Sequence, residues 1–284
     1  MKRWLVLDVS YLCHRALHTS GGLTWKGKAT GVIFGFLKSI TAFKDQFDTD
    51  RVAFCFEHPH LFRRDIYPDY KKRRYQKRTP LEMKQRADLV QQIVALQLDY
   101  LPRIGFKNIF QQEGMESDDL MAAIARDVPE QDEAVLITAD SDLLQCLREN
   151  VTVFSPQKNK LWTVDNFQKE FGFYPSKLAV VKAIAGCKSD NVAGIPMVGE
   201  KSALRYVAKT LDKAPMLARI QSQDGRRRVL FNRQLVQLPY VGCKSPKLQE
   251  DQVSRKAWVE VVHSLGMRSL AGRPPIATRK AHHG

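Results

Sequence analysis

Short apolar runs that alternate with helical patterns constrain the fold of this chain more than any other feature. Runs at 4–7, 52–56, 134–138 and 151–154 have the length and composition of buried β-strands. We also expect a strand at 106–110, and apolar residues at helical spacing fall between the strands at 11–17, 32–43, 89–101 and 120–125. This alternation predicts a parallel α/β sheet with right-handed crossovers over about the first 170 residues.

Acidic side chains follow three of these predicted strands. Asp8, Glu57 and Asp140 each lie just past the end of an apolar run. Because ligands gather at the carboxyl ends of the strands in an open parallel sheet, we expect these carboxylates to share one edge. The stretch 113–147 is dense in acidic residues, and it can bring to the same edge Glu116, Asp118, Asp119 and Asp142.

The number of converging carboxylates indicates bound cations. One acidic residue at a helix start is more often a cap than a ligand, and this applies to Asp118 or Asp119 considered alone. However, two carboxylates about 4 Å apart repel by about 4 kcal/mol at an effective dielectric near 20. Either some of them are protonated or cations neutralise them. Oxygen ligands suit Mg²⁺ or Mn²⁺, and two such ions would serve phosphodiester hydrolysis.

A basic segment at 63–86 points to nucleic acid. It holds ten basic and three acidic side chains, with Tyr67, Tyr70 and Tyr75 between them. A solvated helix face or a flexible loop would also be basic, but interleaved aromatic rings can stack on unpaired bases while cations track phosphates. The whole chain has 45 Lys+Arg against 30 Asp+Glu, a formal net charge of +15. We therefore expect a polyanionic partner whose affinity falls steeply with salt.

The second half of the chain turns helical from about residue 175. In the passage 185–207, Gly194 and Gly199 flank Pro196, and Lys201 opens the next helix. This spacing predicts a tight helix-turn-helix whose backbone N–H groups can meet phosphate, with an ordinary loop as the alternative. Beyond residue 266 the chain is basic with few apolar residues, which predicts a disordered tail.

Composition excludes several classes of protein. No apolar run approaches the roughly 18 residues of a transmembrane helix, so we expect no membrane contact. The start MKRWLVLDVS has too short an apolar run for a signal peptide, which favours the cytoplasm. Five cysteines without a CxxC pair indicate neither a disulfide framework nor a zinc site.

Several stretches of sequence also carry a family resemblance. They are LVLDVS with Arg15, FRRDIYPDYKKRR, ESDDLMAAIA, LITADSDLLQ and KSDNVAGIPMVGEKSA, with FNRQLVQLP downstream. In this order, over roughly residues 3–240, they resemble the 5′ nuclease (flap endonuclease) family of phage 5′ exonucleases and the N-terminal domain of bacterial DNA polymerase I. Any one of these stretches alone would be a weak signal.

The resemblance implies a fold and a domain organisation. It implies an α/β, PIN-like nuclease core with a mostly parallel sheet at 1–172 and a helical arch at about 63–88. A helical DNA-binding region would follow at 173–266, with a helix-three-turn-helix (helix-hairpin-helix) element at 185–207 that holds duplex DNA, often with a K⁺ ion. The basic tail would cover 267–284.

The resemblance also implies roles for individual residues. The metal carboxylates would be Asp8, Glu57, Glu116, Asp118, Asp119, Asp140, Asp142 and Asp190. The catalytic residues that engage the 5′ end and the scissile phosphate would be Arg15, Lys71 and Arg74. DNA contacts would come from Tyr70, Lys72, Arg73, Lys77, Arg78, Gly194, Val198, Gly199 and Lys201.

The implied activity is structure-specific hydrolysis of DNA with two Mg²⁺ or Mn²⁺ ions. Members of the family cut 5′ flaps and nicked or gapped duplex and act as 5′–3′ exonucleases in DNA replication and repair. We expect a monomer whose partners are DNA with 5′ flaps, nicks, gaps or 5′ ends, and RNA primers on DNA. We expect Asp8, Glu57, Glu116 and Asp118 to hold one ion, with the second held by Asp118, Asp140, Asp142 and Asp190.

Two positions depart from the family pattern. Glu57 stands where the family usually has Asp, which keeps the charge and extends the side chain by one methylene. Cys187 stands at the first Asp of the pattern GDxSDN, and a thiol is a poor ligand for Mg²⁺. The alternative interpretation of Cys187 is a small buried residue without a role at the metal site. The departure leaves a second hypothesis open: a structure-specific DNA-binding protein with weak or lost catalysis. A third hypothesis is a PIN-type ribonuclease, and the predicted duplex-holding hairpin argues against it.

Overall fold

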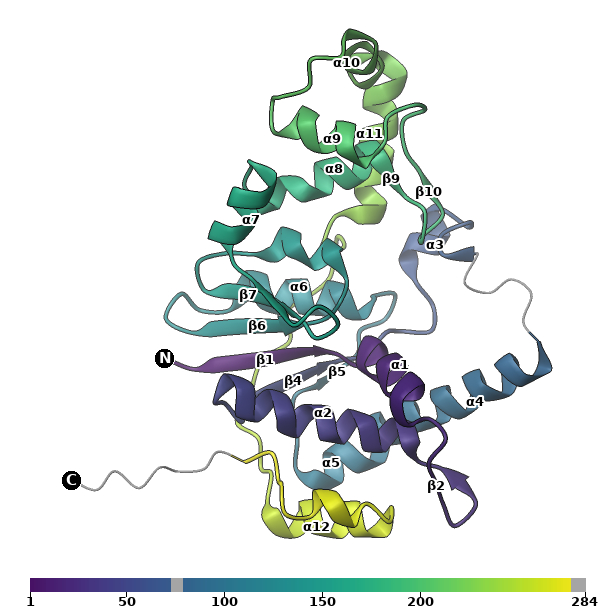
Figure 1. The fold of residues 1–284 in the computed structure, drawn as a ribbon, viewed down its shortest axis with the longest axis vertical. Helices are drawn as coiled ribbons and strands as arrows, with labels where there is room; N and C mark the ends of the chain where they lie inside the picture. The colour runs from purple at the N-terminus through teal and green to yellow at the C-terminus, as the bar shows by residue number, and fades with distance from the viewer. Residues whose placement is uncertain (73–78, 277–284) are drawn as a thin grey trace.

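A six-stranded, mostly parallel sheet forms the centre of the molecule (Figure 1). The computed structural model describes residues 1–72 and 79–276. The strand order is β5-β4-β1-β6-β7-β8, and every neighbouring pair is parallel except β7 with β8. The strands are β1 (Arg3–Asp8), β4 (Val52–Cys55), β5 (Ile109–Phe110), β6 (Glu133–Ile137), β7 (Val151–Ser155) and β8 (Lys160–Trp162). The predicted α/β fold with a mostly parallel sheet is confirmed.

Helices cover both faces of the sheet because successive strand residues point to opposite sides. Leu5 and Leu7 of β1 pack in one apolar core, and Trp4 and Val6 pack in the other. The helices on the Leu5 side are α1 (Val9–Ser20), α2 (Gly31–Phe47), α4 (Pro80–Ala95), α5 (Leu101–Ile104) and α12 (Arg255–Ser264). On the Val6 side lie α6 (Ser117–Asp127) and α7 (Val164–Phe171). The central residues of β1, β4 and β6 are therefore apolar on both faces of the sheet, as the sequence indicated.

The predicted strand at 106–110 is shorter than expected. Helix α5 ends at Gly105, whose φ of 107° is a left-handed conformation that favours glycine. Phe106 then turns into the core, with its ring centroid 4.8 Å from that of Phe54. Regular pairing with β4 begins only at Ile109.

The segment between β4 and α6 contains part of the predicted arch. Helix α3 (Phe62–Ile66) begins it, and α4 starts with a capping box between Thr79 and Glu82. Helix α4 continues through a π-helical turn at Leu96–Tyr100 into α5. Residues 73–78 lie outside the described residues, so the arch stays a prediction.

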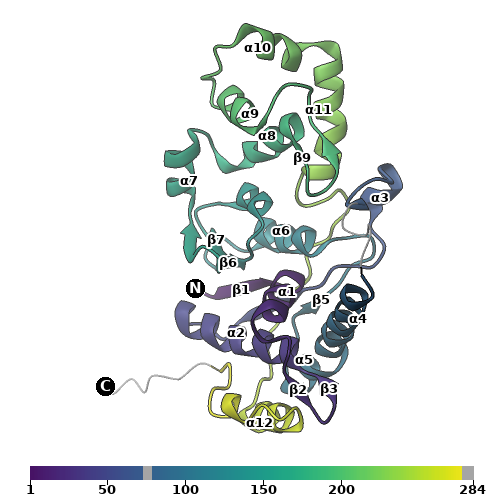
Figure 2. The same cartoon turned by 45° about the vertical axis from the view of Figure 1, so that its right-hand side comes forward.

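A group of helices stands beyond the sheet (Figure 2). Its elements are a 3₁₀ turn at Pro175–Lys177, α8 (Leu178–Ala185), β9 (Gly186–Cys187), β10 (Val192–Ala193), α9 (Glu200–Val207), α10 (Ala214–Gln221) and α11 (Gln223–Val236). A β-hairpin and a turn therefore separate α8 from α9. A Cβ on Gly194 would lie 2.1 Å from Ala185 O, so only glycine fits this close approach. The buried Asn232 donates to Ala183 O and Ala193 O, which ties α11 to both sides of the hairpin.

The C-terminal segment is more ordered near residue 267 than the sequence indicated. Residues Arg268–Leu270 form a 3₁₀ helix, and Leu270 is buried. Trp258 in α12 donates from Nε1 to Leu270 O at 2.7 Å. Two apolar residues, Met267 and Leu270, are enough to dock a short segment, so the predicted tail at 267–284 begins too early. Residues 277–284 lie outside the described residues.

The remaining described elements are small. The strands β2 (Thr24–Trp25) and β3 (Lys28–Ala29) form an antiparallel hairpin between α1 and α2. No helix among the described residues is both long and apolar enough to cross a lipid bilayer.

Candidate active site

The carboxyl ends of β1, β4 and β6 bring the first acidic residues together. Asp8 is the last residue of β1 and pairs in register with Cys55 of β4. Leu7 pairs with Ile137, the last residue of β6. Glu57 and Asp140 follow the ends of β4 and β6, so the three carboxylates start from one edge of the sheet, as expected.

Asp8 is buried at this edge. Its Oδ1 accepts from Tyr11 N at 3.0 Å, which caps α1, and from Ser117 Oγ at 3.2 Å. Its Oδ2 accepts from Thr138 Oγ1 at 3.1 Å. Burial raises the pKa of Asp8, the hydrogen bonds partly offset this, and the charge of Asp140 raises the pKa further. A nearby cation would favour the ionised form.

Glu116 is the best-neutralised carboxylate of the cluster. It precedes α6 and contacts the Lys71 ammonium through Oε1. Its Oε2 accepts from Tyr70 OH at 2.8 Å and Arg63 Nη1 at 3.1 Å. Burial alone would raise the pKa of Glu116, but the Lys71 and Arg63 charges hold it below its usual value.

The Asp119 carboxylate is bonded to protein groups rather than open to a metal ion. Both of its oxygens accept from the Arg63 guanidinium. Oδ2 also accepts from Glu116 N at 3.1 Å, and Oδ1 accepts from Tyr240 N at 2.7 Å. With two hydrogen bonds on each oxygen, this fully buried carboxylate is a structural partner of Arg63. The structure therefore does not support the expected role of Asp119 as a metal ligand.

Asp118 stands among like charges. Burial raises its pKa well above the usual value, and the charges of Glu116 and Asp140 raise it further, against an opposing effect of Lys71. Such a group is held ionised only if positive charge comes close to it. Asp118 therefore lies where a divalent cation would relieve repulsion between carboxylates.

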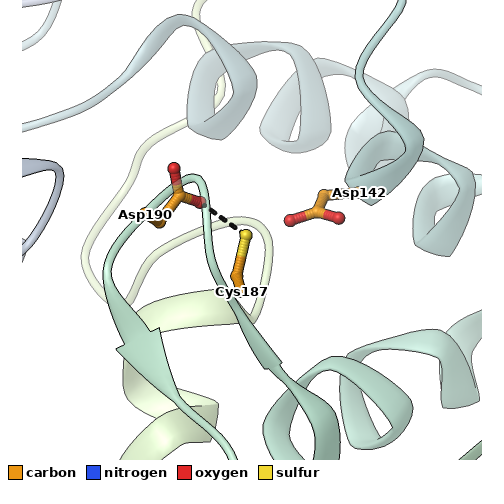
Figure 3. A group of neighbouring side chains, drawn as sticks. All are labelled: Asp142, Cys187 and Asp190. Atoms are coloured by element: carbon orange, nitrogen blue, oxygen red, sulfur yellow. Dashed lines mark hydrogen bonds between the residues drawn. The ribbon is translucent and has the colours of Figure 1, made fainter. Parts of the chain in front are cut away.

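Asp142, Cys187 and Asp190 form a second group (Figure 3). One potential ligand atom from each lies within 4.8 Å of the others. The Cys187 thiol donates to Asp190 Oδ2 at 3.3 Å and lies 3.0 Å from Ser189 Oγ. Asp142 reaches the group from the 3₁₀ helix Ser141–Cys146, which follows Asp140, whereas the other two belong to the β9–β10 hairpin.

The charges in the second group are unevenly balanced. Burial and the neighbouring Asp140 raise the pKa of Asp142 to about 6, although Lys182 Nζ lies 3.0 Å from its Oδ1. Burial, followed by the charge of Asp190, raises the pKa of the Cys187 thiol to about 11. Cys187 is therefore a neutral thiol at neutral pH, in contrast to the carboxylate of the family pattern.

The basic residues expected to engage DNA near the acidic edge fall into three groups. Lys71 is buried on Glu116, and Asp190 O accepts from Lys71 N at 2.9 Å, which links it to the hairpin. Lys72 is exposed and pairs with Asp69 at 2.8 Å, and Arg15 is exposed on α1. Outside the described residues lie Arg73, Arg74, Lys77 and Arg78.

Tyr70 does not lie where the sequence led us to expect a DNA contact. Its side chain is 3% exposed and packs with Leu61, Ala183 and Val192. Its hydroxyl donates to Glu116, so the ring is not presented to a base in this structure. Ala183 and Val192 come from distant parts of the chain, and the local pattern of tyrosines between cations could not reveal them.

The predicted hairpin residues lie at the start of α9. Gly199 is its N-cap, Val198 is buried, and Lys201 is exposed in the first turn. Gly194 makes the close approach to Ala185 described above. These residues shape the turn, and their expected contact with DNA stays a prediction.

The sequence did not identify two cations of the site, Arg63 and Lys182. Arg63 is 1% exposed and also donates from Nε to Leu235 O at 2.9 Å. Nothing in the local sequence separates Arg63 from the nine other basic residues of its segment. Lys182 had a detectable signal, because it is the one charged residue in the otherwise apolar helix α8.

In the described part of the chain, the whole site is an edge rich in carboxylates. Arg63, Lys71 and Lys182 pair with some of its acidic groups. Asp8 and Asp118 have raised pKa values because burial, with the like charge of neighbouring carboxylates, outweighs the hydrogen bonds to Asp8 and the charge of Lys71 near Asp118. Carboxylate oxygens suit hard divalent cations, so the donor set fits Mg²⁺ or Mn²⁺.

Comparisons with known proteins agree with this architecture, which defines a PIN-like α/β protein of the 5′ nuclease type. Residues 3–172 match the family model for the 5′-3′ exonuclease, N-terminal resolvase-like domain. A 5′-3′ exonuclease of Aquifex aeolicus is 32% identical over 212 residues, covering 74% of this chain and 70% of that protein. The chain therefore belongs to the 5′-3′ exonuclease family.

Two further proteins resemble this chain, one in sequence and one in fold. DNA polymerase I of Chloroflexus aurantiacus is 28% identical over 234 residues, which are 80% of this chain but 24% of the polymerase. The fold resembles the bacteriophage T5 flap endonuclease in a pseudo-enzyme–product complex with DNA and metal ions, with a TM-score of 0.69 and 17% identity. That match covers 95% of this chain and 97% of the phage chain. The predicted family is confirmed.

Proposed function

We propose that this protein is a divalent-metal-dependent, structure-specific 5′ nuclease that acts as a 5′–3′ exonuclease and cuts 5′ flaps in DNA. The observation that carries the proposal is the convergence of carboxylates from three strand ends, α6 and the β9–β10 hairpin. Among the residues that the structure describes, Arg63, Lys71 and Lys182 pair with Asp119, Glu116 and Asp142, while burial raises the pKa values of Asp8 and Asp118. An acidic edge of this kind is suited to holding metal ions, and the basic remainder of the chain is suited to holding a polyanion.

The proposed ligands form two groups. Asp8, Glu57, Glu116 and Asp118 would hold one ion. Asp140, Asp142 and Asp190, together with Asp118, would hold the second. Asp119 does not belong to either group, because Arg63 and two backbone amides occupy its oxygens. When bound, the ions would activate the attacking water and stabilise the leaving oxygen.

The protein groups around the ligands position them. Tyr70 and Arg63 fix the Glu116 carboxylate through hydrogen bonds, and Ser117 and Thr138 fix Asp8. Lys71 brings its ammonium to the acidic edge, where it can stabilise negative charge on the scissile phosphate. Arg74 would act with Lys71, and Arg15 would engage the 5′ end.

DNA binding would involve the basic segment and the hairpin. Lys72, Arg73, Lys77 and Arg78 would contact phosphates near the 5′ end, and Gly194, Val198, Gly199 and Lys201 would face the duplex. The related phage structure contains DNA and metal ions, which supports the same partners for this chain. A K⁺ ion at the hairpin, action on RNA primers and a monomeric state are further predictions.

A flap assay tests the proposed function. The purified protein is incubated with 5′-labelled flap DNA, with Mg²⁺ or Mn²⁺ and with a chelator. We expect metal-dependent release of the flap, and a fall of at least about 100-fold in rate for Asp8→Asn. The matched control is Asp165→Asn, which removes an exposed carboxylate at the start of α7. An uncut flap in the presence of metal and intact DNA binding would refute the proposal.

Cys187 gives a test of the competing hypothesis of DNA binding with weak catalysis. The other predicted carboxylate ligands apart from Asp119 remain compatible with a metal site, which favours the enzyme. We expect Cys187→Asp to lower the Mg²⁺ concentration for half-maximal cleavage with little change in the rate at saturating Mg²⁺. Cys187→Ser, which adds no charge, should keep the wild-type requirement. A large gain in the saturated rate for Cys187→Asp would favour the DNA-binding hypothesis.

A further inference from the structure

The group of Asp142, Cys187 and Asp190 combines one sulfur with two carboxylates around a common point. In Figure 3 the two carboxylates point toward the Cys187 sulfur from opposite sides. The sulfur lies 3.3 Å from Asp190 Oδ2, and one potential ligand atom from each of the three residues lies within 4.8 Å of the others. In a tetrahedral site, metal bonds of about 2.3 Å to sulfur and about 2.1 Å to oxygen place these two atoms about 3.6 Å apart. A single ion can therefore bind all three side chains after small adjustments.

The group also leaves room for a further ligand. Cys187 is half-buried at the end of β9, and the next two residues, Lys188 and Ser189, are exposed, so water can reach the sulfur. Three protein ligands and one open position are the arrangement of catalytic zinc sites. Asp142 comes from the 3₁₀ helix Ser141–Cys146, so an ion at this place would tie the β9–β10 hairpin to the edge of the sheet.

The charges of the group favour a thiolate once a divalent ion is bound. Lys182 Nζ lies 3.0 Å from Asp142 Oδ1, so one ammonium, two carboxylates and a neutral thiol leave a single formal negative charge. A divalent ion beside an intact thiol would therefore leave an unbalanced positive charge. A coordinating thiol instead loses its proton to solvent, and the sulfur donates the electron pair that it retains, without oxidation. The thiolate then supplies the charge that the family pattern provides there as a carboxylate.

We propose that Cys187 makes the second metal position selective for thiophilic divalent cations such as Zn²⁺ and Co²⁺, bound through a sulfur–metal bond, over Mg²⁺ and Mn²⁺. The inference rests on the proposed nuclease function, which takes Asp142 and Asp190 as metal ligands. Softness decides the selectivity, because thiolates prefer softer ions, whereas hard Mg²⁺ keeps oxygen ligands and its own water molecules. The first position has only carboxylate ligands, so the two positions would prefer different ions.

Optical titration with Co²⁺ tests for the sulfur–metal bond. The full-length protein is freed of metal with a chelator, dialysed, and titrated with Co²⁺ in the absence of DNA. We expect a sulfur-to-cobalt charge-transfer band in the near ultraviolet that saturates at one ion per chain. Co²⁺ held by carboxylates alone gives no such band, so the first position does not contribute to it. Cys187→Ser should abolish the band, because the serine hydroxyl is not a soft ligand.

Cys146→Ala provides the matched control. Cys146 is a thiol in the same 3₁₀ helix as Asp142, and it lies outside the group, so this variant should keep the full band. The affinity for Zn²⁺ is then measured by calorimetry in excess Mg²⁺, which fills the carboxylate-only position. We expect it to fall at least about 10-fold in Cys187→Ser, because loss of even an outer partner of a metal ligand costs about 10- to 100-fold.

The outcomes separate this inference from the proposed function. A wild-type spectrum without the band, or an equal band in Cys187→Ser, would overturn the inference, while cleavage of flap DNA with Mg²⁺ would still support the nuclease. Protein that shows the band but cuts flap DNA with neither Mg²⁺ nor Mn²⁺ would support the thiolate site and overturn the proposed function. Equal melting temperatures exclude misfolding as the cause. If Cys187→Ser melts early, Cys187→Asp, which restores the residue of the family pattern, should lack the band as well.

Discussion

Arg63 holds together parts of the chain that are far apart in sequence. Its guanidinium bonds to Asp119 in α6 and to the carbonyls of Leu235 and Gln237 at the end of α11. It also lies over the Tyr240 ring, 4.9 Å from the centroid. This residue therefore connects the first helix after β4, the acidic edge and the end of α11.

Loss of Arg63 should be strongly destabilising. Arg63→Met leaves the buried Asp119 without its partner, and we expect the free energy of unfolding to fall by about 3–5 kcal/mol in urea titrations. Arg103→Met should cost less than about 0.5 kcal/mol, because Arg103 forms an exposed pair with Asp99. A loss below about 1 kcal/mol for Arg63→Met would contradict the structural role assigned to this residue.

Two adjacent lysines separate catalysis from binding. Lys71 is buried on Glu116, whereas Lys72 is exposed beside Asp69. We expect Lys71→Ala to lower the single-turnover rate of flap cleavage by about 100-fold, with a small change in DNA affinity. Lys72→Ala should leave the rate within about threefold and weaken binding slightly. Similar rates for the two variants would count against the role of Lys71.

At the scale of elements, the segment 249–252 runs beside residues 105–108 and joins the C-terminal part to the sheet. Gln249 N donates to Asn108 Oδ1, and Gln252 N donates to Gly105 O. Asp251 Oδ1 accepts from Lys107 N at 2.7 Å, but its Oδ2 has no partner among the described residues. Burial raises the pKa of Asp251 to about 6 despite the hydrogen bonds.

This raised pKa predicts a pH-dependent stability. The folded protein binds the Asp251 proton more tightly than the unfolded chain, so the ionised form costs stability above about pH 6, and the cost disappears as pH falls toward 4. Asp251→Asn keeps the Oδ1 acceptor and removes the charge. The free energy of unfolding of Asp251→Asn, relative to that of wild type, should rise by about 1 kcal/mol from pH 4.5 to pH 7.5, after allowance for the partial exposure of Asp251. Urea titrations at both pH values measure it, and a pH-independent difference would refute the assignment.

The strands and the acidic edge could be predicted because their signals are local. The apolar runs mark β1, β4, β6 and β7, and the carboxylates follow them directly in the sequence. The arrangement of α6 could not be predicted, because Asp118 and Asp119 are adjacent and equally acidic. Arg63, 56 residues before Asp119, decides which of the two is neutralised. The docking of Leu270 on Trp258 likewise depends on tertiary packing.

At the scale of the whole molecule, charge is divided between an acidic edge and a basic remainder. The chain carries a formal net charge of +15, although eight acidic residues were predicted for one site. The β9–β10 hairpin meets the basic segment there: Tyr67 OH donates to Asn191 O, and Asn191 Nδ2 donates to Asp69 O. The elements proposed to hold duplex, 5′ end and metal ions are therefore in direct contact.

Calorimetric titration with Mn²⁺ in the absence of DNA measures whether the acidic edge binds divalent cations. We predict at least one saturable site per chain in wild type and in the control Asp165→Asn. Asp118→Asn should lose most of the binding heat, because Asp118 is buried beside the like charges of Glu116 and Asp140 and is proposed to contact both ions. Wild-type protein without saturable Mn²⁺ binding, or an Asp118→Asn variant that binds like wild type, would refute cation binding at the acidic edge.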